Sequence, residues 1–229
     1  MPKKTTTKKT PKRDETLHVS VLIDESGSMG GREEAVTAGF NGFLAELRDG
    51  KAQAKSRVSL AMFDLSGSEP VTRVKVDNVP LEEVCDLVVA DYNPRGSTPL
   101  NDAVVASIRR LDKRVGKNGR AILVVLTDGL ENASETTSAD VRKLIVEKEK
   151  AGWEFIYLGA NQDSWAESQK VAMAKQGGSF DFDASDAGIH DALIVSASRV
   201  KTLRDTPERF EAEGRLMGRK ASEERRKRR

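Results

Sequence analysis

Oxygen-bearing side chains stand at three separate places in the sequence where metal chemistry is plausible. Asp24, Ser26 and Ser28 lie in DESGS, Thr98 lies in GSTPLNDA, and Asp128 lies in TDG. Carboxylate and hydroxyl oxygens suit a hard cation such as Mg²⁺ or Mn²⁺. Because neither His nor Cys stands among these residues, the pattern argues against zinc.

The elements that must position these side chains follow from the hydrophobic pattern. Mostly apolar or alternating runs predict strands, and apolar residues three or four apart predict amphipathic helices. The predicted strands are 17–23, 57–64, 71–77, 121–128, 153–159 and a short edge strand within 177–183. The predicted helices are 32–48, 100–115, 138–151, 164–175 and 188–204, with a short helix or turn at 80–88.

Strands that alternate with helices predict an α/β fold. We expect a Rossmann-like, doubly wound, mostly parallel sheet with helices on both faces. Segments 57–64 and 71–77 are separated by the turn SGSEP, so they should form a hairpin that contributes one antiparallel edge strand. In such sheets ligands bind at the carboxyl ends of the strands, where the first strand delivers Asp24 and the most apolar strand delivers Asp128.

The three motifs DESGS, GSTPLNDA and TDG, in this order and at these strand ends, resemble the metal-ion-dependent adhesion site of von Willebrand factor A-type domains. The resemblance covers about residues 16–204, and no ligand position departs from the family's pattern. It implies that Ser26 and Ser28 ligate the metal directly, that Thr98 does so in the ligand-competent state, and that Asp24 and Asp128 bind mainly through water.

The resemblance also implies a function. One coordination position would stay open for an Asp or Glu of a partner protein, so the chain would be a non-enzymatic, metal-dependent binding module. The resemblance is to the stand-alone bacterial or phage type, and intracellular bacterial relatives often work beside AAA+ ATPases or within stress and phage-encoded gene sets. The partner that this implies is an AAA+ ATPase or another intracellular complex. In some members, metal occupancy is coupled to movement of the last helix, here about 188–204.

Each ligand position also has a plain structural interpretation. Ser26 or Ser28 could cap the first helix, and Thr98 could cap a helix that begins at Pro99. Asp128 and Gly129 form an ordinary turn pair. These interpretations do not account for three segments that converge on one sheet edge with the same ligand chemistry.

The charge distribution divides the chain of 229 residues into three parts. Residues 1–15 and 207–229 are predicted to be basic tails, and 16–206 the single domain. Residues 1–13 carry six Lys/Arg and no acid, whereas 207–229 carry nine Lys/Arg and five Glu. The tails are either solvated ends or contacts for an anionic partner, so a nucleic-acid-associated scaffold is the alternative function.

Cellular location is predicted from two features. The single cysteine, Cys85, permits no intramolecular disulfide, and no apolar run is long enough to span a membrane. We therefore expect a cytoplasmic protein without a membrane partner. Cys85 lies among apolar residues and is predicted to be a buried thiol, whereas Glu25 is expected either to be solvated or to tune the site.

Enzymatic readings fit less well. A phosphoryl-transfer enzyme of the haloacid-dehalogenase type would need a second acid two residues after Asp24, but Ser26 stands there. A response-regulator receiver would need an adjacent acidic pair and a later lysine, which the sequence after WEFIYLG lacks. Met29 occupies the second glycine position of a dinucleotide-binding pattern, so the sequence does not support a dinucleotide-binding fold.

Overall fold

The computed structural model describes residues 16–49, 55–67, 69–116, 119–160, 179–183 and 185–205. The two predicted tails, at 1–15 and 207–229, and the helix predicted at 164–175 lie outside these residues. The domain limits of 16–206 therefore stay a prediction.

A six-stranded sheet forms the centre of the fold, in the order β3-β2-β1-β4-β5-β6. All neighbouring strands are parallel except β2 and β3, which are antiparallel. The mostly parallel sheet with one antiparallel edge strand is thus confirmed. The strands are β1 (Leu17–Asp24), β2 (Ser56–Ser66), β3 (Glu69–Pro80), β4 (Arg120–Thr127), β5 (Glu154–Ala160) and β6 (Ser179–Phe182).

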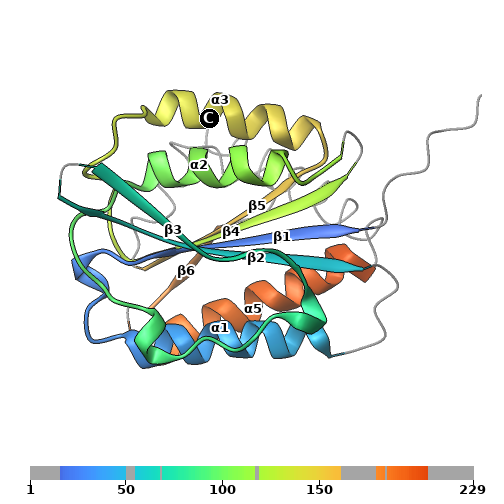
Figure 1. The fold of residues 1–229 in the computed structure, drawn as a ribbon, viewed down its shortest axis with the longest axis horizontal. Coiled ribbons are helices and arrows are strands. Elements are labelled where there is room, and N and C mark those ends of the chain that lie inside the picture. Colours follow the sequence, from blue (N-terminus) through green and yellow to red (C-terminus); the bar gives the residue numbers. More distant parts are fainter. Residues whose placement is uncertain are drawn as a thin grey trace, which may run out of the picture.

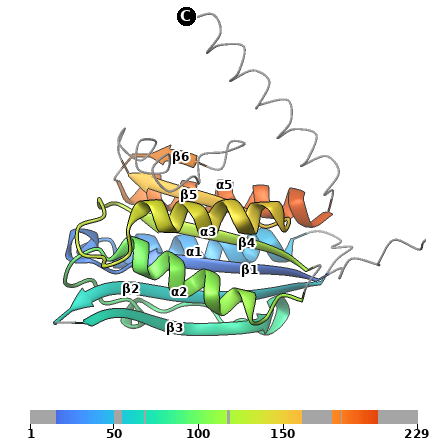
Figure 2. The ribbon, with the colours of Figure 1, turned by 90° about the horizontal axis from the view of Figure 1, so that it is seen from above.

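Helices cover both faces of this sheet, as expected for a doubly wound fold. Figures 1 and 2 show α2 (Leu100–Asp112) and α3 (Ser138–Lys150) on one face, and α1 (Glu33–Arg48) and α5 (Asp186–Asp205) on the other. Within the described residues, short 3₁₀ turns lie in the connections: η1 (Gly27–Met29), η2 (Leu81–Glu83) and η3 (Val89–Asp91). Among the described helices, none is both long and apolar enough to cross a bilayer.

Strand β1 shows why the sheet must be covered on both sides. Val19, Val21 and Ile23 belong to the apolar cluster that includes residues of α1 and α5, whereas Leu22 belongs to the cluster that includes residues of α2 and α3. All eight residues of β1 are buried. Central parallel strands are apolar on both faces for this reason, and burial holds the end of β1 in a fixed position.

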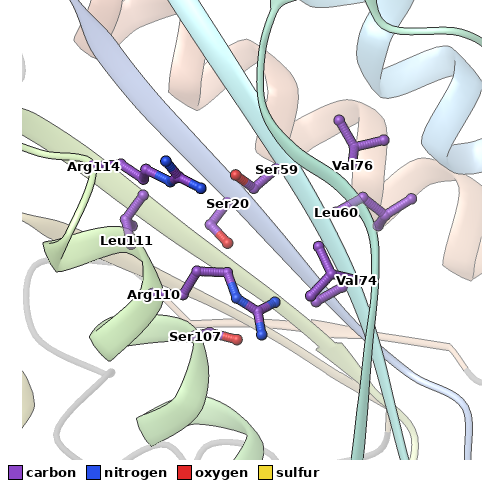
Figure 3. A pocket seen from close by; sticks show the side chains of 10 residues that line it. Ser20, Ser59, Leu60, Val74, Val76, Ser107, Arg110, Leu111 and Arg114 are labelled. Carbon is purple, nitrogen blue, oxygen red and sulfur yellow. The ribbon is translucent and has the colours of Figure 1, made fainter.

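A small cavity, lined by both polar and apolar residues, interrupts the packing between α2 and the sheet. It has a volume of about 10 Å³, which is enough for about one water molecule. Three serines and two arginines that line it appear in Figure 3 beside apolar residues of β2, β3 and α2: Ser20, Ser59, Ser107, Arg110 and Arg114. The cavity lies near the middle of β1, away from the end that carries Asp24.

The prediction of a buried Cys85 is wrong, since this residue is exposed. After η2 the chain continues without helical or strand structure, and its apolar side chains Val84 and Leu87 turn into the core. Cys85 lies between them and faces solvent. The apolar neighbours of Cys85 in the sequence therefore did not predict the orientation of its side chain.

Candidate metal centre

The turn after β1 gathers the first three predicted ligands. Asp24 is the last residue of β1 and is fully buried. Its Oδ1 accepts a hydrogen bond from the backbone N–H of Ser26 over 2.8 Å, which curls the chain around the carboxylate. The hydroxyls of Ser26 and Ser28 lie 3.1 Å apart, and the buried side chain of Met29 anchors the turn in the core.

Strand β4 brings the second carboxylate to the same place, because β1 and β4 are direct neighbours. The hydroxyl of Thr127, the last residue of β4, donates to Asp24 Oδ2 over 2.5 Å. The next residue, Asp128, accepts at Oδ1 from the hydroxyl of Ser28 over 2.7 Å. Hydrogen bonds thus connect residues about a hundred positions apart in the chain.

Thr98 completes the group, and Gly129 shows how close the oxygens come to one another. A Cβ atom on Gly129 would lie 3.0 Å from Thr98 Oγ1, 3.6 Å from Ser28 Oγ and 3.7 Å from Asp24 Oδ2. Three side-chain oxygens from two segments, the turn after β1 and the loop of Thr98, therefore lie close to one backbone position of a third segment that has no side chain. The structure brings all five predicted residues together at this edge.

The loop that carries Thr98 is held by its backbone. Ser97 and Leu65 exchange two backbone hydrogen bonds of 3.0 and 3.2 Å, and Gly27 N–H donates to the carbonyl of Gly96 over 3.0 Å. Gly96 has a φ of 66°, and a Cβ there would lie 1.9 Å from the carbonyl oxygen of Leu65. Only glycine fits at this close approach.

The capping interpretations of two predicted ligands are not borne out. Ser26 precedes η1, and its side chain makes no capping hydrogen bond. The N-cap position of α2 is occupied by Pro99 rather than by Thr98, and no side-chain capping hydrogen bond is made there. The backbone N–H of Thr98 instead donates to Asn132 Oδ1 over 2.9 Å. The hydroxyls of Ser26 and Thr98 are therefore not used by helix ends.

Burial makes the charge of Asp24 unfavourable in this arrangement. Burial raises the pKa of Asp24 to about 6, although hydrogen bonds from Thr127 and Ser26 oppose the shift, and the nearby charge of Asp128 adds to it. A bound cation would relieve both effects. Within the described ranges, no group of three or more His, Cys, Asp or Glu side chains could hold a metal by itself. The donor set at this edge is instead mixed carboxylate and hydroxyl oxygen.

Two further residues contact this edge of the sheet. The sequence leaves the role of Glu25 open and does not single out Arg32. Glu25 is 1% exposed and not solvated: its Oε1 accepts from Arg73 over 2.5 Å and from the backbone N–H of Asn93 over 2.6 Å. It thereby ties the turn after β1 to β3 and to the loop before Thr98. Arg32, which the sequence pattern does not single out, forms an ion pair with Asp128.

Comparisons with known proteins bear on the fold that carries this site. The family model of the von Willebrand factor type A domain matches residues 18–193. Among curated proteins, no sequence matches the chain.

Solved structures share the fold at low sequence identity. The PilB minor pilin from Streptococcus sanguinis superposes with a TM-score of 0.57 at 12% identity, over 85% of this chain and 63% of that one. A von Willebrand factor type A structure from Catenulispora acidiphila superposes with a TM-score of 0.54 at 14% identity, over 82% of this chain and 43% of that one. Proximal thread matrix protein 1 from the mussel byssus, with a zinc-occupied adhesion motif, gives 0.57 at 15%, over 83% and 48%. The chain thus spans less than two thirds of the length of each of these proteins.

Proposed function

The chain belongs to the von Willebrand factor type A domain family, and on that premise we propose that it is a metal-dependent protein-binding module. The proposed module presents a divalent cation, Mg²⁺ or Mn²⁺, to an acidic side chain of a partner protein. Members of this family generally serve as interaction modules rather than as enzymes, and the proposal assigns no reaction to this chain.

The observation that carries the proposal is the convergence of oxygens around Gly129. Thr98 Oγ1, Ser28 Oγ and Asp24 Oδ2 all lie within 4 Å of the position that a Cβ there would occupy. The residues that would hold the ion are Asp24, Ser26, Ser28, Thr98 and Asp128. A bound divalent cation would supply a positive, oxygen-seeking centre at the edge of the sheet.

The chemistry of the donor set favours a role in binding. Three of the five proposed ligands are neutral hydroxyls, so the cation would stay more electrophilic than in a site built from carboxylates alone. Asp24 and Asp128 hold the serine hydroxyls and backbone in place through the hydrogen bonds described above. An acidic side chain of a partner would then complete the coordination.

The proposed setting is the cytoplasm, with a partner that is an AAA+ ATPase or belongs to another intracellular complex. The single cysteine supports a reducing compartment. The basic tails give nucleic acid as the alternative ligand, and their residues lie outside those that the structure describes. The strong salt dependence of nucleic-acid binding would separate the two.

Calorimetric titration of the full chain with Mg²⁺, Mn²⁺ and Zn²⁺ tests the metal site first. The wild type should bind at least one of these ions with a stoichiometry of one, and Ser28→Ala should lose that binding. Ser20→Ala is the matched control, because Ser20 lies on β1 at the cavity under α2 rather than at the sheet edge. Equal binding by all three proteins would overturn the assignment of the site.

Capture from a lysate then tests the binding module. Wild type and Ser28→Ala would be compared in Mg²⁺ and in EDTA, with bound proteins identified by mass spectrometry. A protein retained by the wild type only with metal supports the proposal. If wild-type and variant lanes match with metal and with EDTA, the site is not the capture surface.

A further inference from the structure

Arg32 occupies a position at the proposed metal site that the ligand pattern leaves unassigned. It directly precedes α1, and its side chain is 22% exposed. Its Nη1 donates to the backbone carbonyl of Ser28 over 2.9 Å and contacts Asp128 Oδ2 in an ion pair. The guanidinium thus joins the two loops that carry proposed ligands.

The ion pair uses the carboxylate oxygen that the serine leaves free. Asp128 Oδ1 accepts from the hydroxyl of Ser28 over 2.7 Å, while Oδ2 faces Arg32. The side chain of Asp128 is 6% exposed, so its charge has little solvent around it. Arg32 therefore supplies positive charge to the same carboxylate that the proposed cation would use.

We infer that Arg32 is a built-in competitor of the metal, which lowers the affinity of the site for divalent cations. The inference rests on the proposed function and concerns the regulation of the same site. A divalent cation near Asp128 and a guanidinium bonded to Asp128 are like charges within a few ångströms, and they repel each other. Loading of the site must therefore weaken or break the Arg32–Asp128 contact.

This exchange makes metal occupancy depend on two competing cations. Without metal, Arg32 compensates Asp128 and keeps the two loops together. With metal, the charge of Arg32 opposes the ion, so half-occupancy requires a higher concentration of free divalent cation. The chain thus has two arrangements of one site, and the ion shifts the balance between them only by its preference for one.

A positioning role for Arg32 predicts the opposite result. If Arg32 merely held Asp128 ready for the metal, removal of the guanidinium would weaken metal binding. The sign of the change in affinity therefore separates a competitor from a positioning residue.

The test is calorimetric titration of the full chain with Mn²⁺, comparing wild type with Arg32→Gln, Arg32→Met and Arg32→Lys. We expect the Arg32→Gln and Arg32→Met variants to bind Mn²⁺ about tenfold more tightly than wild type, because a like charge is removed from a partly buried site. The Arg32→Lys variant keeps the positive charge, so its affinity for Mn²⁺ should stay near that of wild type. Arg109→Gln is the matched control, since Arg109 is exposed on α2, about 13 Å along the helix from Leu100.

Thermal unfolding in EDTA gives a second readout that does not depend on the loaded site. Arg32→Gln should unfold at a lower temperature than wild type without metal, because Asp128 loses its ion pair, and Mn²⁺ should reverse the order. Unchanged or weaker Mn²⁺ binding by both Arg32→Gln and Arg32→Met would overturn the inference while leaving the proposed function intact. If no variant binds any divalent ion, both fail together.

Discussion

Serine hydroxyls gather at two places on the same sheet, and their neighbours give the two places opposite character. At the carboxyl edge, Ser26 and Ser28 lie beside Asp24 and Asp128 and bond to one another and to carboxylate oxygen. Under α2, the serines lie beside arginines instead (Figure 3). On our proposal, the first place binds a cation and the second does not.

Strand β1 contributes to both places. Ser20 precedes Asp24 by four residues, or about 13 Å along the strand, and faces Ser59 of β2 in the sheet register. Arg114, which lines the cavity, pairs with the half-exposed Asp77 over 2.6 Å, and Ser107 Oγ is buried without a hydrogen-bond partner. Hydroxyl content alone therefore does not identify a metal site. Our proposal for the sheet edge rests instead on the sign of the surrounding charge and on the convergence of several oxygens.

The largest effect is expected for Gly129→Val, which places a branched side chain among the converging oxygens. A Cβ there lies 3.0 Å from Thr98 Oγ1, so the oxygens must separate. We expect Mn²⁺ affinity to fall by at least about 100-fold in calorimetry. Gly116→Val is the control, since no atom lies within 4 Å of its added Cβ. Retained affinity in Gly129→Val would show that these oxygens do not hold the ion.

Gly96→Ala tests whether the backbone of the Thr98 loop must approach β2 so closely. The φ of 66° and the 1.9 Å approach to Leu65 O predict a loss of about 2–3 kcal/mol in the free energy of unfolding. Gly67→Ala shares a positive φ of 89° but meets open space, so it should lose only about 1 kcal/mol. Urea denaturation in EDTA measures the free energy of unfolding of both variants. Equal losses would mean that the positive φ alone, and not the close approach to Leu65, accounts for the destabilisation.

Asp24→Asn separates function from stability at the sheet edge. Because burial disfavours the charge of Asp24, the amide should raise the free energy of unfolding in EDTA at pH 7.5 by about 1–3 kcal/mol. Metal binding should be lost at the same time. Asp77→Asn provides the contrast near the cavity: this half-exposed carboxylate pairs with Arg114, and its loss should cost less than about 1 kcal/mol. A destabilised Asp24→Asn protein would show that its hydrogen bonds outweigh the burial of charge.

The smallest effect is expected for Ser107→Ala in the cavity. Removing a buried hydroxyl that has no partner should change the free energy of unfolding by less than about 1 kcal/mol. Mn²⁺ affinity should equal that of wild type, in contrast to Ser28→Ala. A loss of metal binding in Ser107→Ala would mean that the two serine clusters are coupled, and the distinction between them would then fail.

Local pattern was sufficient for the frame of the fold. The buried run at 17–23, the apolar periodicity at 32–48 and the run at 121–128 correspond to β1, α1 and β4 within one residue at each end. Strands and helices of this kind are specified by the spacing of apolar residues, which the sequence displays directly. The antiparallel β2–β3 pair was also predicted, although both strands extend beyond the expected segments.

Side-chain environment was harder to predict, because it depends on distant partners. Glu25 was left open between solvent and the site, and its burial depends on Arg73 of β3 and on Asn93. The predicted burial of Cys85 was wrong because an irregular segment has no periodicity from which the orientation of a side chain could be inferred. Arg32 gave no signal, since its contact with Asp128 spans 96 residues of chain.

The sequence by itself determined which residues can donate oxygen at the sheet edge and in which segments they lie, because strand ends and residue types are local properties. Tertiary structure alone decided that these oxygens surround Gly129 and that Arg32 faces the same carboxylate. The physical reason is the pairing of β1 with β4, which places Asp24 beside Thr127 and Asp128. Distances of a few ångströms between distant segments arise only when the sheet is assembled.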